Sequence, residues 1–130
     1  MGKLEKDFIK PVEPGEKIQI EDICITAFKI PHDAADPVGY KFESGGRKFA
    51  IATDIGEMNE NIFLAISGCS CVLLESNHHV DMLLKGNYPY NLKQRIRGKC
   101  GHLSNEEAAI TCSRLVSVGT KKILLGHLSE

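Results

Sequence analysis

The stretch NENIFLAISGCSCVLLE, residues 59–75, marks where the pattern of apolar residues changes along the chain. Its first part, residues 59–66, carries apolar residues at helical spacing, with Asn59 at an N-cap position and Gly68 just past the end. Its last part, residues 71–75, is a nearly continuous apolar run, as expected for a strand buried on both faces. The stretch therefore predicts a helix followed by a buried strand.

The segments before this stretch predict a β-rich half. Short runs rich in β-branched and aromatic residues follow one another there, and a Ser-Gly-Gly turn separates the last two. These runs are KIQI (17–20), ICITAFKI (23–30), VGYKFE (38–43) and KFAIAT (48–53).

The segments after residue 75 predict helices and one more strand. HVDMLLKG (79–86) and NLKQRIRG (91–98) are short helical patterns, and Pro89 suits the first turn of the second. Ser104, three residues before Glu107, forms a capping box for a helix from Asn105 to about Val118. The apolar run at residues 121–125 predicts a final buried strand. Strands followed by alternating strands and helices predict an α/β (α+β) fold, a mixed sheet with helices on one face, in a single domain of residues 1–130.

Composition predicts a cytoplasmic protein, and its net charge near zero does not indicate a charged partner. The 16 basic and 17 acidic side chains nearly cancel, so a nucleic acid would have to be met by a local patch. The five cysteines include no CxxC pair, and the sequence shows neither a secretion leader nor an apolar run of about 18 residues. We therefore expect reduced thiols, a cytoplasmic location and no membrane partner.

The tetrapeptide GHLS occurs twice, in two different structural settings. The first copy places His102 in the loop that leads into the capping-box helix, and the second places His127 directly after the last strand. Other titratable or amide side chains also follow predicted strands: His32, Asp33, Asp54, Glu75, Asn77 and His78. Imidazole and carboxylate groups that converge from several strand ends are typical of a divalent-metal site.

Four blocks of the sequence, in this order, resemble a known family. They are PHDAADPVGYKFESGGRKFAIATDIG (31–56), LLESNHH (73–79), YPYNLKQRIRGKCGHLSNEEAA (88–109) and ILLGHLSE (123–130). Together they resemble the second half of a metallo-β-lactamase-fold hydrolase, closest to the WalJ/YycJ-like exonuclease branch. The resemblance implies half of an αββα sandwich.

The resemblance also implies roles for particular residues. His32 and His127 correspond to terminal metal ligands, and Asp54 corresponds to the aspartate that bridges two metal ions in the complete family site. His102 is a candidate general acid, with Glu75 holding or tuning it. The ions are expected to be zinc, with manganese as the alternative, and they would activate water to hydrolyse a phosphodiester.

DNA is the substrate that the resemblance implies. Asn77 and His78 are candidates for substrate contact, as are Arg95 and Arg97 in the basic segment LKQRIRGK (92–99). The alternative interpretation of that segment is a solvated helix face.

The motif His-x-His-x-Asp-His of the superfamily lies upstream of these blocks, and this sequence has no histidine before His32. We therefore expect the chain to be the C-terminal portion of the domain and inactive alone. His32, Asp54 and His127 would give one metal ion three ligands only if their loops converge without the missing half, and otherwise no metal is bound. The missing half would leave an apolar sheet face uncovered, which predicts a homodimer or pairing with the missing N-terminal half. Two alternative functions remain: a non-catalytic fragment or assembly module with a vestigial site, and a thioester or lactam hydrolase.

Overall fold

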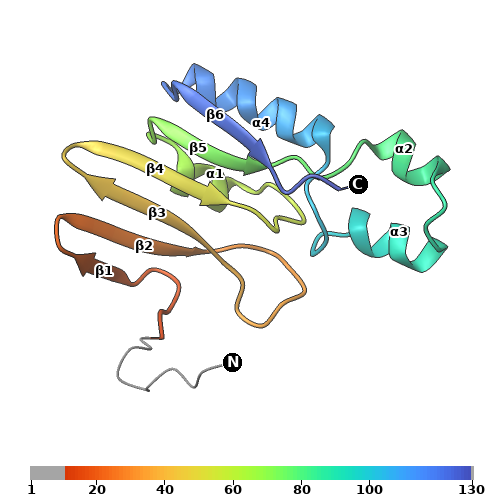
Figure 1. Ribbon diagram of the computed structural model, residues 1–130, viewed down its shortest axis with the longest axis horizontal. Helices are drawn as coiled ribbons and strands as arrows, with labels where there is room; N and C mark the ends of the chain where they lie inside the picture. Colours follow the sequence, from red (N-terminus) through yellow and green to blue (C-terminus); the bar gives the residue numbers. More distant parts are fainter. Residues whose placement is uncertain (1–10, 130) are drawn as a thin grey trace.

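The computed structural model describes residues 11–129, which form one six-stranded mixed sheet and four helices (Figure 1). The strands lie side by side in sequence order, antiparallel from β1 to β4 and parallel from β4 to β6. The predicted mixed α/β sheet is thereby confirmed. The elements are β1 (Lys17–Ile20), β2 (Ile23–Lys29), β3 (Val38–Ser44), β4 (Arg47–Ala52), α1 (Glu60–Ile66), β5 (Cys71–Glu75), α2 (Val80–Lys85), α3 (Tyr90–Arg97), α4 (Asn105–Ser117) and β6 (Lys122–Gly126).

Helices α1 and α4 cover one face of the sheet, and the core lies between them and the central strands. Side chains alternate between the two faces of a strand, so Ala50, Val72 and Leu74 share the covered face and are fully buried. They join a cluster that includes Ile62 of α1 and Leu115 of α4. Full burial of a side chain such as Leu74 stabilises the fold by about 1.5–3 kcal/mol.

The helix ends predicted from the sequence are confirmed. The Asn59 side chain accepts a hydrogen bond from the backbone N–H of Ile62 at 3.0 Å, and Gly68 adopts a positive φ of 77° just past α1. Ser104 caps α4 by accepting from the N–H of Glu107 at 3.2 Å. Pro89 sits at the N-cap position of α3, one residue before the predicted first turn.

Helices α2 and α3 lie beyond the carboxyl ends of β5 and β6, away from the covered face (Figure 1). Leu83 is the buried residue of α2, and α3 buries none of its side chains. Because these helices hardly contribute to the core, their position shapes the surface around the strand ends instead. Within residues 11–129, no helix has both the length and the apolar character that crossing a bilayer requires.

The other face of the sheet is apolar and carries no helix of the described chain. The strand pairing places Phe42 beside Phe49, and Ile51 beside Leu73 and then Leu124, on the face opposite Val72. The Phe42 and Phe49 rings stack with centroids 5.9 Å apart, and Leu124 is 55% exposed. This face, named the open face below, has the apolar character predicted for the chain.

Candidate metal centre

The sheet topology brings the predicted metal ligands to one edge. Parallel strands β4, β5 and β6 end together, so Asp54, Glu75 and His127 emerge side by side. His32 follows β2, which runs in the same direction as β4 because two antiparallel pairings separate them. His102 reaches the same edge from the loop before α4.

Two of these residues have unusual backbone conformations. Asp54 has a φ of 57° and His127 a φ of 59°, in the left-handed region that residues other than glycine rarely adopt. Such conformations cost free energy and persist where the surrounding structure fixes them, most often at functional sites. Each sharp turn occurs just past a strand end.

Glu75 is the centre of the cluster and is fully buried. Its Oε1 atom accepts hydrogen bonds from Nδ1 of His102 at 2.8 Å and from Nδ1 of His127 at 2.7 Å. Its Oε2 atom accepts from the backbone N–H groups of Ile55 at 2.6 Å and Leu103 at 3.3 Å. Because a carboxylate only accepts, both histidines donate from Nδ1, which leaves both Nε2 atoms available for a metal or a proton.

Asp54 faces three imidazole rings. Its Oδ1 atom lies 3.6 Å from Nδ1 of His127, 3.8 Å from Nδ1 of His102 and 3.8 Å from Nε2 of His32. The His102 ring centroid lies 5.2 Å from that of His32 and 5.0 Å from that of His127. The structure therefore brings all three predicted metal ligands together with the predicted catalytic pair.

The donor set fits a divalent metal ion. Asp54, Glu75, His102 and His127 each offer one atom, and these atoms all lie within 4.8 Å of one another. Glu75 already accepts hydrogen bonds from both histidines. A carboxylate in this arrangement orients metal-binding imidazoles and does not itself coordinate the metal. His32 is oriented similarly, since its Nδ1 donates to the carbonyl of Gly101 at 3.1 Å. Its Nε2 lies between two carboxylates, 3.4 Å from Oδ1 of Asp33 and 3.8 Å from Oδ1 of Asp54. His32, Asp54 and His127 stay the predicted metal ligands, and the four-residue cluster contains two of them, Asp54 and His127.

The loop that carries His102 is held tightly against α3. The backbone N–H of His102 donates to the carbonyl of Ile96 at 2.9 Å. A Cβ atom added at Gly101 would overlap that same carbonyl, so only glycine fits there. This close approach places His102 beside His32.

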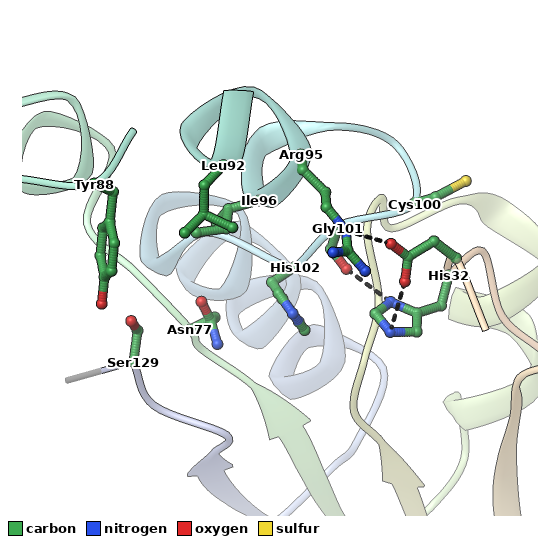
Figure 2. A pocket seen from close by; sticks show the side chains of 11 residues that line it. His32, Asn77, Tyr88, Leu92, Arg95, Ile96, Cys100, Gly101, His102 and Ser129 are labelled. Atoms are coloured by element: carbon green, nitrogen blue, oxygen red, sulfur yellow. Dashed lines mark hydrogen bonds and ion pairs between the residues drawn. The ribbon is translucent and has the colours of Figure 1, made fainter. Parts of the chain in front are cut away.

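A cavity of about 380 Å³ opens at these histidines (Figure 2). In Figure 2 His32 lies at one side of it, Tyr88 and Ser129 lie at the opposite side, and His102 lies between them. Arg95 reaches it from α3 and donates from Nε to Asp33 at 2.6 Å. This hydrogen bond holds the pKa of the Asp33 carboxyl below its usual range.

Of the residues predicted to contact substrate, some line this cavity and others do not. Asn77 lines the cavity and donates to the backbone carbonyl of His127 at 2.8 Å. His78 is 7% exposed and lies outside the metal cluster, and burial lowers its pKa. Arg97 is exposed and does not line the cavity that Arg95 reaches. The structure thus brings Asn77 and Arg95 to the centre, but not Arg97.

Sequence reasoning missed several residues that line the cavity. Tyr88 and Ser129 lie within the family-like blocks 88–109 and 123–130 but were given no role, and Asp33 stood out only as a residue after a strand. The available signal was their position in loops at the edge where parallel strands end.

Comparison with known proteins identifies relatives for most of the chain. A family model described as "Beta-lactamase superfamily domain" matches residues 4–128. The exodeoxyribonuclease YycJ of Bacillus anthracis is 41% identical over 115 residues, which are 88% of this chain and 44% of that protein. The exodeoxyribonuclease WalJ of Streptococcus pneumoniae is 37% identical over 130 residues, which are 100% of this chain and 48% of that protein. The chain therefore spans about half the length of these curated relatives.

Solved structures share the fold at low sequence identity. Zinc-bound PqqB from Methylobacterium extorquens superposes with a TM-score of 0.68 at 18% identity, over 91% of this chain and 44% of that one. The metallo-beta-lactamase fold protein YhfI from Bacillus subtilis gives 0.66 at 15% identity, over 92% and 42%. Human tRNase Z, short form, gives 0.59 at 18% identity, over 87% and 39%. At these identities the likeness establishes the fold alone.

Proposed function

The chain belongs to the beta-lactamase superfamily, and from that premise we propose that it is the C-terminal half of a metal-dependent DNA exonuclease. The observation that carries this proposal is the pair of histidines, His102 and His127, anchored on the single buried carboxylate of Glu75 beside Asp54. Relatives named exodeoxyribonucleases support the choice of DNA as substrate. Their length, about twice that of this chain, supports an upstream half that supplies the remaining ligands.

The proposed reaction divides roles among the residues of the cluster. Divalent ions would be held by His32, Asp54 and His127, with two ions in the complete site. We expect zinc, with manganese as the alternative. When bound, these ions would activate water and neutralise charge on the phosphate. His102 would donate the proton on Nε2 to the leaving oxygen of the cleaved phosphodiester. For this step the His102 ring would carry a proton on both nitrogens, and Glu75 would favour that doubly protonated ring by accepting from Nδ1.

Arg95 supports an anionic substrate over a lactam or a thioester. Its guanidinium is fixed by Asp33 at the wall of the cavity that His32 and His102 line. Arginine is well suited to bind phosphate oxygens. The ion pair with Asp33 would orient Arg95 toward a strand entering the cavity.

We expect loss of Arg95 and Arg97 to weaken DNA binding and to reduce its salt dependence. Each contact with a phosphate contributes about 0.7–0.9 to the slope of log K against log salt, so the double variant Arg95→Ala, Arg97→Ala should lower that slope by about 1.5. The measurement is a salt titration of binding to a fluorescent single strand. Lys121→Ala with Lys122→Ala removes the same charge at the opposite end of β6 and should leave the slope unchanged. Unchanged binding in the arginine variant would exclude α3 from the DNA interface.

The open face supports a partner in the complete protein, and we propose that the upstream half covers it. Phe42, Phe49 and Ile51 lie on that face with no helix of the described chain over them. A large apolar surface left uncovered on a soluble protein promotes association.

Without that cover, the chain is expected to self-associate at micromolar concentration through the open face. Light scattering measures the association, and Leu124→Lys should reduce it because this half-exposed side chain lies on the open face. Leu64→Lys is the matched control, since Leu64 is 68% exposed on α1, on the other side of the sheet. A monomer at all concentrations would contradict the proposal.

A further inference from the structure

A second cavity adjoins the candidate metal centre. It has a volume of about 720 Å³ and lies between α2, the loop after it and the start of α4. Asn77, Tyr88 and Ser129 line both this cavity and the smaller one that holds His32 and His102. A group bound in the second cavity would therefore be a direct neighbour of a phosphodiester placed at the histidines. Its volume falls in the range typical of small-molecule sites.

The two cavities differ in charge. The smaller one carries Arg95 and Asp33, whereas no lysine, arginine or carboxylate side chain of the described residues lines the larger one. A phosphate group suits the first, because burying an unpaired charge in an uncharged cavity is costly. The second cavity suits a neutral part of the same substrate.

The lining of the larger cavity combines apolar surface with hydrogen-bonding groups. Tyr88 and Met82 contribute an aromatic ring and a thioether, and the buried side chain of Leu83 also lines the cavity. Amide side chains accompany them: Asn77, Asn87 and Asn105. The Oδ1 atom of Asn105 already accepts from Ser76 at 2.7 Å, so its amide nitrogen is the group that remains to donate.

His78 adds a buried polar atom with an unmet hydrogen bond. His78 lines the larger cavity and is 7% exposed, and its Nδ1, which is closed to solvent, has no hydrogen-bond partner among the described residues. A buried polar atom without a partner is costly, so turning of the His78 ring toward a hydrogen-bonding ligand in the cavity would be favourable.

We propose that the larger cavity binds the terminal nucleobase of the DNA strand whose phosphodiester lies at the metal centre, an inference that rests on the proposed function. A nucleobase is neutral and flat and has polar edges. It can stack on Tyr88 while its edge meets His78 and the amides. The cavity would thus select a strand end with an unpaired base and set the register of the phosphodiester next to His102.

The test compares two oligonucleotides with the whole 130-residue chain. Both are nuclease-resistant phosphorothioate single strands with a fluorescent label, and they differ only in whether the terminal nucleotide carries a base or is abasic. Wild-type chain should bind the strand with the terminal base about tenfold more tightly, which is near the low end of what stacking one base contributes. Tyr88→Leu should abolish this difference, whereas Tyr90→Leu should keep it, because Tyr90 is 75% exposed and lines neither cavity.

A second readout locates the base directly. In chain labelled at its methionine methyl groups, the strand with the terminal base should shift the NMR signal of Met82, which lines the cavity, and leave that of Met58, which packs against the core. Equal binding of the two strands, or a preference that survives Tyr88→Leu, would overturn the nucleobase site while leaving the proposed exonuclease standing. Absence of binding to both strands would overturn the proposed nucleic-acid function and the nucleobase site with it.

Discussion

Replacing Glu75 with glutamine is expected to weaken zinc binding by about 10–100-fold while the chain stays folded. The carboxylate accepts from two histidines at Oε1 and from the backbone N–H groups of Ile55 and Leu103 at Oε2. A glutamine amide has one accepting oxygen and one donating nitrogen, so one of these two sets loses its acceptor.

Of these two sets of donors, the histidines are the one that can change its hydrogen bonding, because an imidazole nitrogen can either donate or accept. If the amide oxygen keeps the two backbone N–H groups, its nitrogen faces Nδ1 of His102 and of His127. Each imidazole can then accept at Nδ1, but the proton moves to Nε2, where it blocks coordination. The fold is thus preserved while the tautomer needed for metal binding is lost.

Elemental mass spectrometry and a competitive zinc titration measure this effect. The wild-type chain should bind zinc, and His127→Ala should lose it because a proposed ligand is removed. His79→Ala is the control, since His79 is half-exposed, pairs with Glu106 at 3.4 Å and lies outside the cluster. Unchanged zinc affinity in Glu75→Gln, with unchanged circular dichroism, would contradict the role given to Glu75. A wild-type chain that binds no zinc would show that these side chains alone do not hold the ion.

Much of the fold follows from local sequence signals. The pattern of residues 59–75 predicts α1 and β5 because helical and strand periodicities differ and both are read over a few residues. Asn59 and Ser104 mark helix starts because a cap needs only the next three residues. Helices α2 and α3 bury few side chains. Because they lack a strong apolar pattern, their position beyond the strand ends could not be predicted from the sequence.

The site could be predicted in part for a similar reason. Residues that follow parallel strands share one edge of the sheet, so the convergence of Asp54, Glu75 and His127 follows from topology. The bond between Glu75 and His127 joins residues 52 positions apart and depends on side-chain direction, which strand order does not fix. Side-chain direction also decides that Arg95 lines the cavity and Arg97 does not, because residues two apart on a helix point to different sides.

The second large effect concerns His102. In the complete protein, with the upstream half present, His102→Ala is expected to lower kcat for DNA hydrolysis by about 10²–10⁴-fold, the range that general acid catalysis contributes. DNA has a poor leaving group, since the departing sugar oxygen needs a proton as its bond to phosphorus breaks. His102 lines the cavity beside His32 and is oriented by Glu75 to donate that proton from Nε2.

The leaving group distinguishes a general acid from a metal ligand at this position. Bis(p-nitrophenyl) phosphate releases a stable phenolate that needs no proton, so His102→Ala should slow its hydrolysis far less than that of DNA if His102 is the acid. If His102 instead coordinates the metal, as its place among the four clustered side chains would allow, both substrates should slow together and zinc affinity should fall. Lys121→Ala, just before β6 and at the opposite end of that strand from His127, is the control and should leave both rates unchanged. A DNA-specific loss with intact zinc binding would assign the proton to His102, and a shared loss would move His102 into the metal shell.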